Sequence, residues 1–268
     1  MNSQYSGAQL ELELESQPTS GRYTDSDNLI AWLRCLRAAY LAGYFGGTVH
    51  EVYPDVPAGS RENYLYFTLA PALNFQRSSE GLWRAALATY QDTETRFVFF
   101  PEKTVATDFE TFKRALVTHR LALQPQKHSE IWYRISCTLH ERFESDPRAL
   151  LRSQNHDVVQ VKSYIQAHKR DFPYLSGPKL LNYWLYMLLS FTDARLSSRE
   201  EISIIPDLHV CRATERLGLV PAGTDSTPEQ VAARWRELLT GSDIAPCELH
   251  GPLWRWSRSN FRELPRAH

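Results

Sequence analysis

Apolar residues recur at helical spacing along most of the chain from about residue 25 onward. In the first such segment a capping residue, Ser26 or Asp27, precedes the pattern, and glycines from Gly43 onward follow it. The spacing therefore predicts a helix from Asp27 to about Gly43, with a buried stripe formed by Ile30, Leu33, Leu36 and Leu41.

The same reasoning predicts further helices along the rest of the chain. One covers residues 62–75, a second contains Trp83, Leu87 and Tyr90, and a short one starts at Pro147. The others cover residues 108–121, 130–143, 157–168, 179–191, 207–217 and 228–239. The run from Phe97 to Pro101 is the clearest strand-like segment. The pattern as a whole predicts an all-α fold of about ten helices with very little strand.

The segment from Lys179 to Phe191 is the most apolar of these helices, with hydrophobic residues on almost every face. Such a helix is expected at the centre of a folded unit. It follows a Ser176-Gly177-Pro178 turn. Its longest apolar stretch is far below the roughly 20 residues that a membrane span requires, so no membrane anchor is expected.

Residues 1–24 have a different composition, rich in Ser, Gln, Gly, Thr and Glu, and they predict a disordered N-terminal tail. This tail has no basic start and no apolar signal core, so a cytoplasmic protein is expected, nucleoid-associated if it is prokaryotic. Residues 25–268 are expected to form a single helical unit with two lobes. One lobe would contain about residues 25–125 with the C-terminal segment, and the other about residues 126–240.

The 268 residues include 30 Lys and Arg against 31 Asp and Glu, for a formal net charge of −1. A protein that coats nucleic acid is usually basic overall, so any DNA-binding surface must be local. The small basic excess of residues 151–268 places it in the second half. The four cysteines are far apart and predict reduced thiols, and neither a metal site nor another cofactor is expected.

Two residues suggest covalent chemistry on an N-glycosidic bond: Lys179, which follows the glycine turn, and Asp207, which begins a later helix. A primary amine can attack the sugar carbon that carries a base, and a carboxylate stabilises the positive charge that develops on the sugar. Burial of the 179–191 helix would desolvate Lys179 and lower its pKa. The structural alternatives are a lysine that extends its ammonium to water and an aspartate that only caps its helix.

Leu175-x-Gly177-x-Lys179 followed by Pro206-Asp207-x-His209-Val210-x-Arg212 resembles the helix-hairpin-helix DNA glycosylase superfamily, which includes endonuclease III and the 8-oxoguanine glycosylases. Residues 247–254 are similar in rhythm to the tail of the archaeal 8-oxoguanine enzymes. The resemblance covers about residues 170–260. It implies a two-lobed helical fold with the active site between the lobes, a monomeric DNA glycosylase and AP lyase, and removal of a modified, oxidised purine from double-stranded DNA.

Further site residues follow from the same stretches. The nucleic-acid-binding candidates are Ser176, Gly177, His209, Arg212 and Arg216. A flipped base also needs flat apolar walls and hydrogen-bonding groups, for which the candidates are Asn74, Gln76, Trp184 and Trp254. A structural histidine, a solvated basic helix face and core packing of the tryptophans remain the alternatives.

Two other functions fit the same residues. An N-glycosidase that hydrolyses a free modified nucleoside or nucleotide, of the queuosine-salvage type, would depend on Asp207 but not on Lys179, and the near-zero net charge suits it. A non-catalytic helix-hairpin-helix DNA-binding protein would depend on neither residue for chemistry.

Overall fold

A computed structural model describes residues 26–46, 52–74, 77–221 and 226–265. In these ranges the chain forms 12 α-helices, α2 to α13, and four short 3-10 helices, without any strand. The all-α prediction is confirmed. The expected tail of residues 1–24 and the base-pocket candidate Gln76 lie outside the described residues.

The chain divides into two compact units. Unit 1 draws on residues 1–48 and 200–268, and unit 2 on residues 49–199. The lobe boundary expected near residue 125 falls inside unit 2, between α6 (Phe109–Thr118) and α7 (Pro125–Arg142). These two helices pack together, and the rings of Phe112 and Tyr133 lie 5.6 Å apart across the contact.

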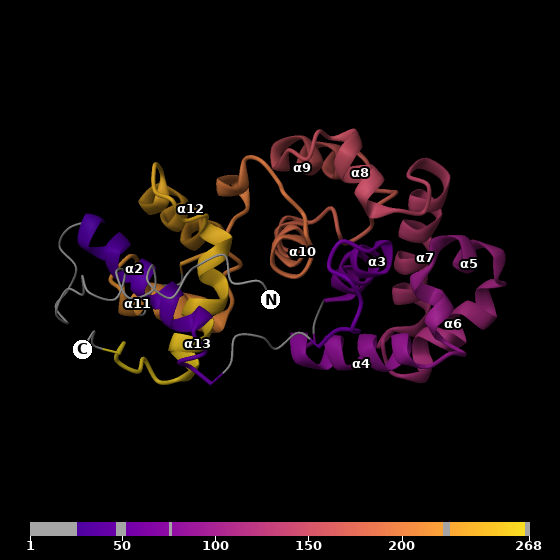
Figure 1. Ribbon diagram of the computed structural model, residues 1–268, viewed down its shortest axis with the longest axis horizontal. Coiled ribbons are helices and arrows are strands. Elements are labelled where there is room, and N and C mark those ends of the chain that lie inside the picture. The colour runs from indigo at the N-terminus through magenta and orange to yellow at the C-terminus, as the bar shows by residue number, and fades with distance from the viewer. Residues whose placement is uncertain (1–25, 47–51, 75–76, 222–225, 266–268) are drawn as a thin grey trace. The chain divides into compact units, whose positions relative to one another are not determined.

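Unit 1 combines the first described helix with the last ones (Figure 1). Its elements are α2 (Ser26–Leu41), α11 (Leu208–Arg216), α12 (Pro228–Leu239), the 3-10 helix Pro246–Leu249 and α13 (His250–Arg258). The two ends of the sequence meet where Arg34 pairs with Asp243 and Arg37 with Glu248. The apolar core of this unit contains Leu33, Leu36, Val210, Trp235 and Leu253.

The buried face of α2 differs from the predicted stripe. Leu33 and Leu36 are fully buried, but Ile30 is only half-buried and the Leu41 side chain is 49% exposed. Trp32 and Cys35 belong to the core instead, and the Trp32 ring packs edge-on against Trp256 of α13. The buried face of α2 is therefore rotated from the predicted stripe so that it includes Trp32, because an aromatic ring buries more apolar surface than an aliphatic side chain.

Unit 2 is a bundle of short helices around an aromatic core (Figure 1). In addition to α6 and α7, it contains α3 (Arg61–Leu69), the 3-10 helix Ala70–Leu73, α4 (Ser79–Gln91), the 3-10 helix Arg96–Phe99, α5 (Pro101–Ala106), α8 (Pro147–Ser153), α9 (Val158–Ala167) and α10 (Pro178–Phe191), and the 3-10 helix Arg199–Glu201 follows at its end. As predicted, α10 is largely buried, and it packs against α3.

The strand predicted for Phe97 to Pro101 is wrong. Residues 96–99 form a 3-10 helix, and Pro101 occupies the first turn of α5. The carbonyl of Val98 accepts hydrogen bonds from the Trp132 indole at 2.8 Å and the Thr104 hydroxyl at 3.1 Å, so its backbone is satisfied without a sheet. An apolar run of this length does not distinguish a strand from a buried turn.

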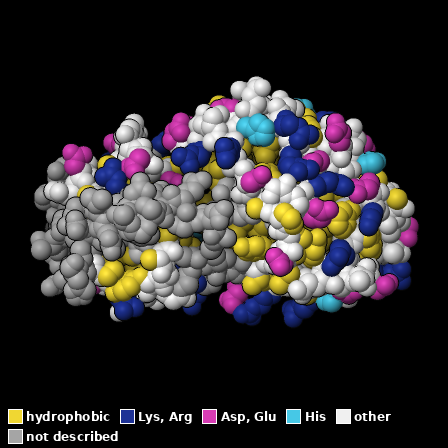
Figure 2. All heavy atoms as spheres, in the orientation of Figure 1, with side chains coloured by type: hydrophobic (Ala, Val, Ile, Leu, Met, Phe, Trp, Pro, Cys, Tyr) yellow, Lys and Arg dark blue, Asp and Glu magenta, His cyan; other side chains and the backbone are white. Residues whose placement is uncertain are grey.

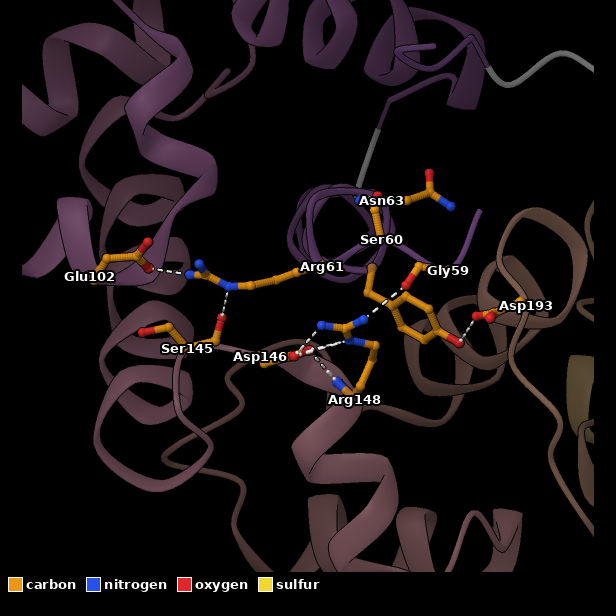
Figure 3. Close-up of polar contacts among 10 residues, drawn as sticks. Gly59, Ser60, Arg61, Asn63, Glu102, Ser145, Asp146, Arg148 and Asp193 are labelled. Atoms are coloured by element: carbon orange, nitrogen blue, oxygen red, sulfur yellow. Dashed lines mark hydrogen bonds and ion pairs between the residues drawn. The ribbon is translucent and has the colours of Figure 1, made fainter. Parts of the chain in front are cut away.

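A group of ion pairs fixes the start of α3 (Figure 3). The Arg148 guanidinium binds both carboxylate oxygens of Asp146 and donates to the carbonyl of Gly59 at 2.8 Å. The Tyr64 hydroxyl donates to Asp193 at 2.8 Å, just after α10, and burial raises the pKa of Tyr64 to about 12. These contacts connect α3, α8 and the end of α10 and thereby hold α10 in register. Arg148 is paired with Asp146, and Asp193 accepts from Tyr64, so we assign the group a structural role.

Among the helices that the structure describes, none has both the length and the hydropathy to cross a membrane.

Candidate functional site

The backbone N–H groups of the glycine turn before α10 form hydrogen bonds within the turn itself. The N–H of Ser176 donates to the Phe172 carbonyl, and that of Gly177 to the Tyr174 carbonyl, each at 3.0 Å. The two N–H groups are therefore engaged within the turn, and the role of Ser176 and Gly177 as nucleic-acid-binding candidates stays a prediction. A Cβ on Gly177 would lie 3.2 Å from the Tyr174 carbonyl oxygen, which explains the glycine by close backbone approach.

The beginning of α10 offers different donors. Gly177 is the N-cap without a side-chain cap, and Leu181 is the residue whose N–H bonds back to the Gly177 carbonyl. The N–H groups of Lys179 and Leu180 precede that bond and so cannot take part in the helical pattern. Together with the positive end of the helix dipole, this end of α10 can attract an anionic group.

Lys179 itself is exposed. The buried face of α10 starts at Leu180 and continues through Leu181, Trp184 and Leu185. A residue in the first turn projects from the end of the helix, so the apolar sequence that follows does not enclose it. The expectation that α10 desolvates this lysine is therefore wrong.

Asp207 caps α11 as predicted. Its Oδ1 atom accepts hydrogen bonds from the backbone N–H groups of His209 and Val210, each at 2.9 Å. Across the described residues no hydrogen bond reaches the second oxygen, Oδ2, and the side chain is half-buried. One carboxylate oxygen thus fixes the orientation of the group, while the other is available to a ligand.

The rings of His209 and Trp254 are in contact, although the two residues are 45 positions apart in the sequence. Their ring centroids lie 5.2 Å apart with an edge-on geometry, and His209 Nδ1 lies 3.3 Å from the Ser257 hydroxyl. The guanidinium of Arg258 lies 4.8 Å from the centre of the Trp254 ring. Asp207, His209, Trp254, Ser257 and Arg258 form what we term the α11–α13 site.

Ser257 is the member of this site that the sequence did not reveal. Helix α13 was not predicted, although Leu253 and Trp256, buried and three positions apart, give its spacing. With that helix assigned, Trp254 and Arg258 fall one turn apart on its surface. Arg258 is exposed and holds its charge over the half-buried indole.

Of the other base-pocket candidates, Trp184 is enclosed by the core, whereas Asn74 is half-buried and stays a prediction. Trp184 is fully buried, and its indole donates to Thr68 at 3.1 Å, so its assignment to the base pocket is wrong. The Asn74 amide donates to the Ser79 hydroxyl at 3.2 Å and so helps to define the turn before α4. Trp256, the other tryptophan of α13, is buried and donates to the Arg262 carbonyl. Trp254 therefore remains the candidate for the flat aromatic wall of a base pocket.

The two basic candidates of α11, Arg212 and Arg216, are exposed, and the Arg216 guanidinium lies 5.7 Å from the centre of the Phe261 ring. Basic and acidic side chains are interspersed over the face drawn in Figure 2. This mixture agrees with the net charge of −1 and limits any contact with nucleic acid to local groups.

Lys179 belongs to unit 2 and Asp207 to unit 1, so the convergence of their amine and carboxylate stays a prediction. No protein-family model and no curated protein matches the chain. A function is therefore inferred from two separate places in the fold, the start of α10 in unit 2 and the α11–α13 site in unit 1. The first offers a cation and N–H groups that make no hydrogen bond to the described residues. The second offers an oriented carboxylate and, two residues later on the same helix, a histidine ring in contact with an aromatic ring.

Proposed function

We propose that this protein is a DNA N-glycosylase with AP lyase activity that removes a modified purine, with oxidised guanine as the first substrate to test. The observation that carries the proposal is the Asp207 carboxylate, which is held by two backbone N–H groups through Oδ1 and has Oδ2 free of partners among the described residues. A carboxylate fixed in this way can face a cationic sugar without having to reorganise during the reaction.

In the proposed reaction, the uncharged amine of Lys179 attacks C1′ of the nucleotide. The C1′–N bond breaks, and its electron pair leaves with the base, which takes up a proton. Asp207 stabilises the positive charge that develops on the sugar and accepts the proton that the amine must lose. Opening of the sugar ring then gives a Schiff base between Lys179 and C1′, and β-elimination from this adduct cleaves the strand.

The α11–α13 site supplies the remaining groups that base removal requires. Trp254 offers a half-buried aromatic surface for an extruded base, and Arg258 and His209 lie against that ring. The N–H groups of Lys179 and Leu180, which make no hydrogen bond to the described residues, suit a strand phosphate.

The exposure of Lys179 favours a second candidate function, hydrolysis of a free modified nucleoside or nucleotide. In that reaction water attacks the sugar in place of the amine, Asp207 keeps its role, and Lys179 has none. The near-zero net charge also suits a small substrate, because it provides little long-range attraction to DNA.

Borohydride trapping separates these functions. The full-length protein is incubated with duplex oligonucleotides that contain 8-oxoguanine or an abasic site, and with free 8-oxoguanosine, while base release and covalent adducts are measured. The variants are Lys179→Gln and Asp207→Asn. Their matched controls are Lys169→Gln, at another exposed lysine of unit 2, and Asp108→Asn, at another aspartate that caps a helix.

We expect the parent protein and both controls to form an adduct with abasic DNA, and Lys179→Gln to form none. Asp207→Asn should lose base release by about 100-fold or more, the range observed when one transition-state electrostatic contact is removed. If Lys179→Gln still releases the base from the free nucleoside, the protein is a nucleoside hydrolase and the proposed lyase activity is rejected. Unchanged behaviour of both variants on every substrate would leave a DNA-binding protein without catalysis.

A further inference from the structure

Unit 2 contains a cavity of about 510 Å³ between the start of α4 and the end of α6. Its lining includes no residue of the α10 start or of the α11–α13 site. Its polar lining is basic: Arg77, Arg84, His119 and Arg120 contribute to it, and none of the described lining residues is Asp or Glu. A cavity with charges of one sign concentrates counter-ions of the other sign.

Arg77 forms the fixed part of this cavity. Its guanidinium donates to the carbonyl of Leu121 at 2.8 Å and to the carbonyl of Gly81 at 2.9 Å. Both acceptors are neutral, so these bonds hold the guanidinium in place without neutralising it. The Arg77 Nε atom is buried and makes no hydrogen bond to any described residue.

Arg120 adds a second uncompensated charge. It lies just after α6 in the left-handed region, with φ of 58°, and its side chain is exposed. None of the ion pairs among the described residues includes Arg77 or Arg120. Arg77 and Arg120 line the same cavity, and the pKa of Arg77 is lowered by burial and further by repulsion from the Arg120 charge.

The acidic groups nearby are already engaged. Glu80 pairs with Arg84, and Asp92 lies 2.7 Å from Nε2 of His119. The 13-residue helix α4 also begins at this cavity, and its dipole directs positive potential toward it. Arg77 and Arg120 therefore face a site where the local field favours a negatively charged ligand.

We propose that this cavity, the Arg77–Arg120 pocket, is an anion site that binds a phosphate group. The Arg77 guanidinium, held by two carbonyls, and the exposed Arg120 guanidinium line the same cavity, and both can donate to the oxygens of a phosphate. The phosphate can belong to a nucleic-acid strand or to a free phosphorylated small molecule. Binding here requires neither Lys179 nor Asp207, so the inference goes beyond the proposed glycosylase chemistry.

Arg120→Gln is the test variant, because Arg120 is exposed and its side chain makes no hydrogen bond or ion pair with the described residues. Arg114→Gln is the matched control: Arg114 is an exposed arginine on α6 whose guanidinium bonds to Thr111, outside the pocket. Arg77→Gln is less suitable, since it removes two bonds that hold the turns together.

Two measurements on the full-length protein distinguish the sources of phosphate. Fluorescence anisotropy with an undamaged duplex is recorded at 50 and 200 mM salt, which are chosen because phosphate contacts are strongly salt-dependent. Thermal unfolding is followed with and without inorganic phosphate. For a nucleic-acid phosphate, Arg120→Gln should weaken duplex binding by about 10-fold and reduce the slope of log affinity against log salt by about one, whereas Arg114→Gln should not.

Loss of the phosphate-induced thermal shift in Arg120→Gln, with duplex binding unchanged, would support the site and assign it to a free phosphorylated molecule. The proposal is overturned if Arg120→Gln matches Arg114→Gln in both measurements. Base release plays no part in either readout, so a failure of the glycosylase proposal would leave this result interpretable.

Discussion

The indole of Trp184 donates a 3.1 Å hydrogen bond to the hydroxyl of Thr68, and both side chains are completely buried. This bond connects α10 to α3 in the interior of unit 2. A buried indole N–H has no access to water, so Thr68 is the acceptor that allows a tryptophan at this position. The start of α10, and with it Lys179, is positioned by this contact and its apolar surroundings.

We therefore predict that Thr68→Val destabilises the protein although it preserves the volume of the side chain. The indole N–H would lose its acceptor while remaining buried, at a cost of about 1–3 kcal/mol in the free energy of unfolding. Urea denaturation measures this change. Thr118→Val is the control, because the Thr118 hydroxyl is exposed on α6, and a surface change of this kind stays within about 0.5 kcal/mol. Equal costs for the two variants would contradict the prediction.

Local signals of the sequence predicted much of the fold. Helices were predicted to begin at Asp108, Asp157, Asp207 and Pro228. In the structure the side chains of Asp108, Asp157, Asp207 and Thr227 each accept a backbone N–H at the start of these helices. Capping depends on residues two or three positions apart, so the local sequence contains the information that a helix start requires.

The remaining features depend on contacts between distant segments. The burial of Trp184 requires Thr68, and the union of α2 with the C-terminal helices requires Arg34 to meet Asp243, 209 positions later. Neither contact can be predicted from the residues that surround each partner in the sequence. Lys179 illustrates the limit: the sequence indicated a buried helix correctly, but not that its first turn would remain outside the core.

We predict that a glycine-to-alanine substitution at Gly251 lowers the free energy of unfolding, opposite to the usual effect of this change in a helix. A glycine-to-alanine change within a helix normally stabilises a protein by about 0.5–1 kcal/mol. Here a Cβ would lie 2.7 Å from the Tyr40 Oη atom and 2.8 Å from Cζ of the same ring. Gly251→Ala should therefore destabilise unit 1 by about 1–3 kcal/mol, as measured by thermal or urea unfolding.

The Tyr40→Ala background tests whether this ring is the cause. With the ring removed, Gly251→Ala should cost nothing or become stabilising, and the difference between the two backgrounds gives the coupling energy of the pair. An equal cost in both backgrounds would exclude the contact with Tyr40 as the explanation.

The pair Asp146–Arg148 predicts a pH dependence of stability. Burial raises the pKa of Asp146, but the hydrogen bonds from the Arg148 side chain and backbone N–H outweigh it, and the pKa lies below its usual value. A depressed pKa contributes stability that is present above the unfolded value, about 3.9, and is lost as the pH falls through the folded value. We expect Asp146→Asn to cost about 1–3 kcal/mol at pH 7.

The difference between the parent and Asp146→Asn should shrink as the pH falls below about 4, because Asp146 of the unfolded parent is protonated first and that of the folded parent follows at its lower pKa. Urea denaturation at pH 7, 5 and 3.5 follows it. Asp171→Asn removes a more exposed ion pair, with Arg142, and should change stability by at most about 1 kcal/mol. A gap between the parent and Asp146→Asn that is constant with pH would show that its cost is not electrostatic.

Asp207 allows its structural role to be separated from its proposed chemical role, because two substitutions affect them differently. Asparagine caps a helix about as well as aspartate, so Asp207→Asn should leave the free energy of unfolding within a few tenths of a kcal/mol of the parent. Asp207→Ala removes the acceptor of the His209 and Val210 N–H groups and should cost about 0.5–2 kcal/mol. If the carboxylate serves the reaction, both variants lose base release to a similar extent although only one is destabilised. If it serves only as a cap, activity follows stability, and Asp207→Asn behaves like the parent in both measurements.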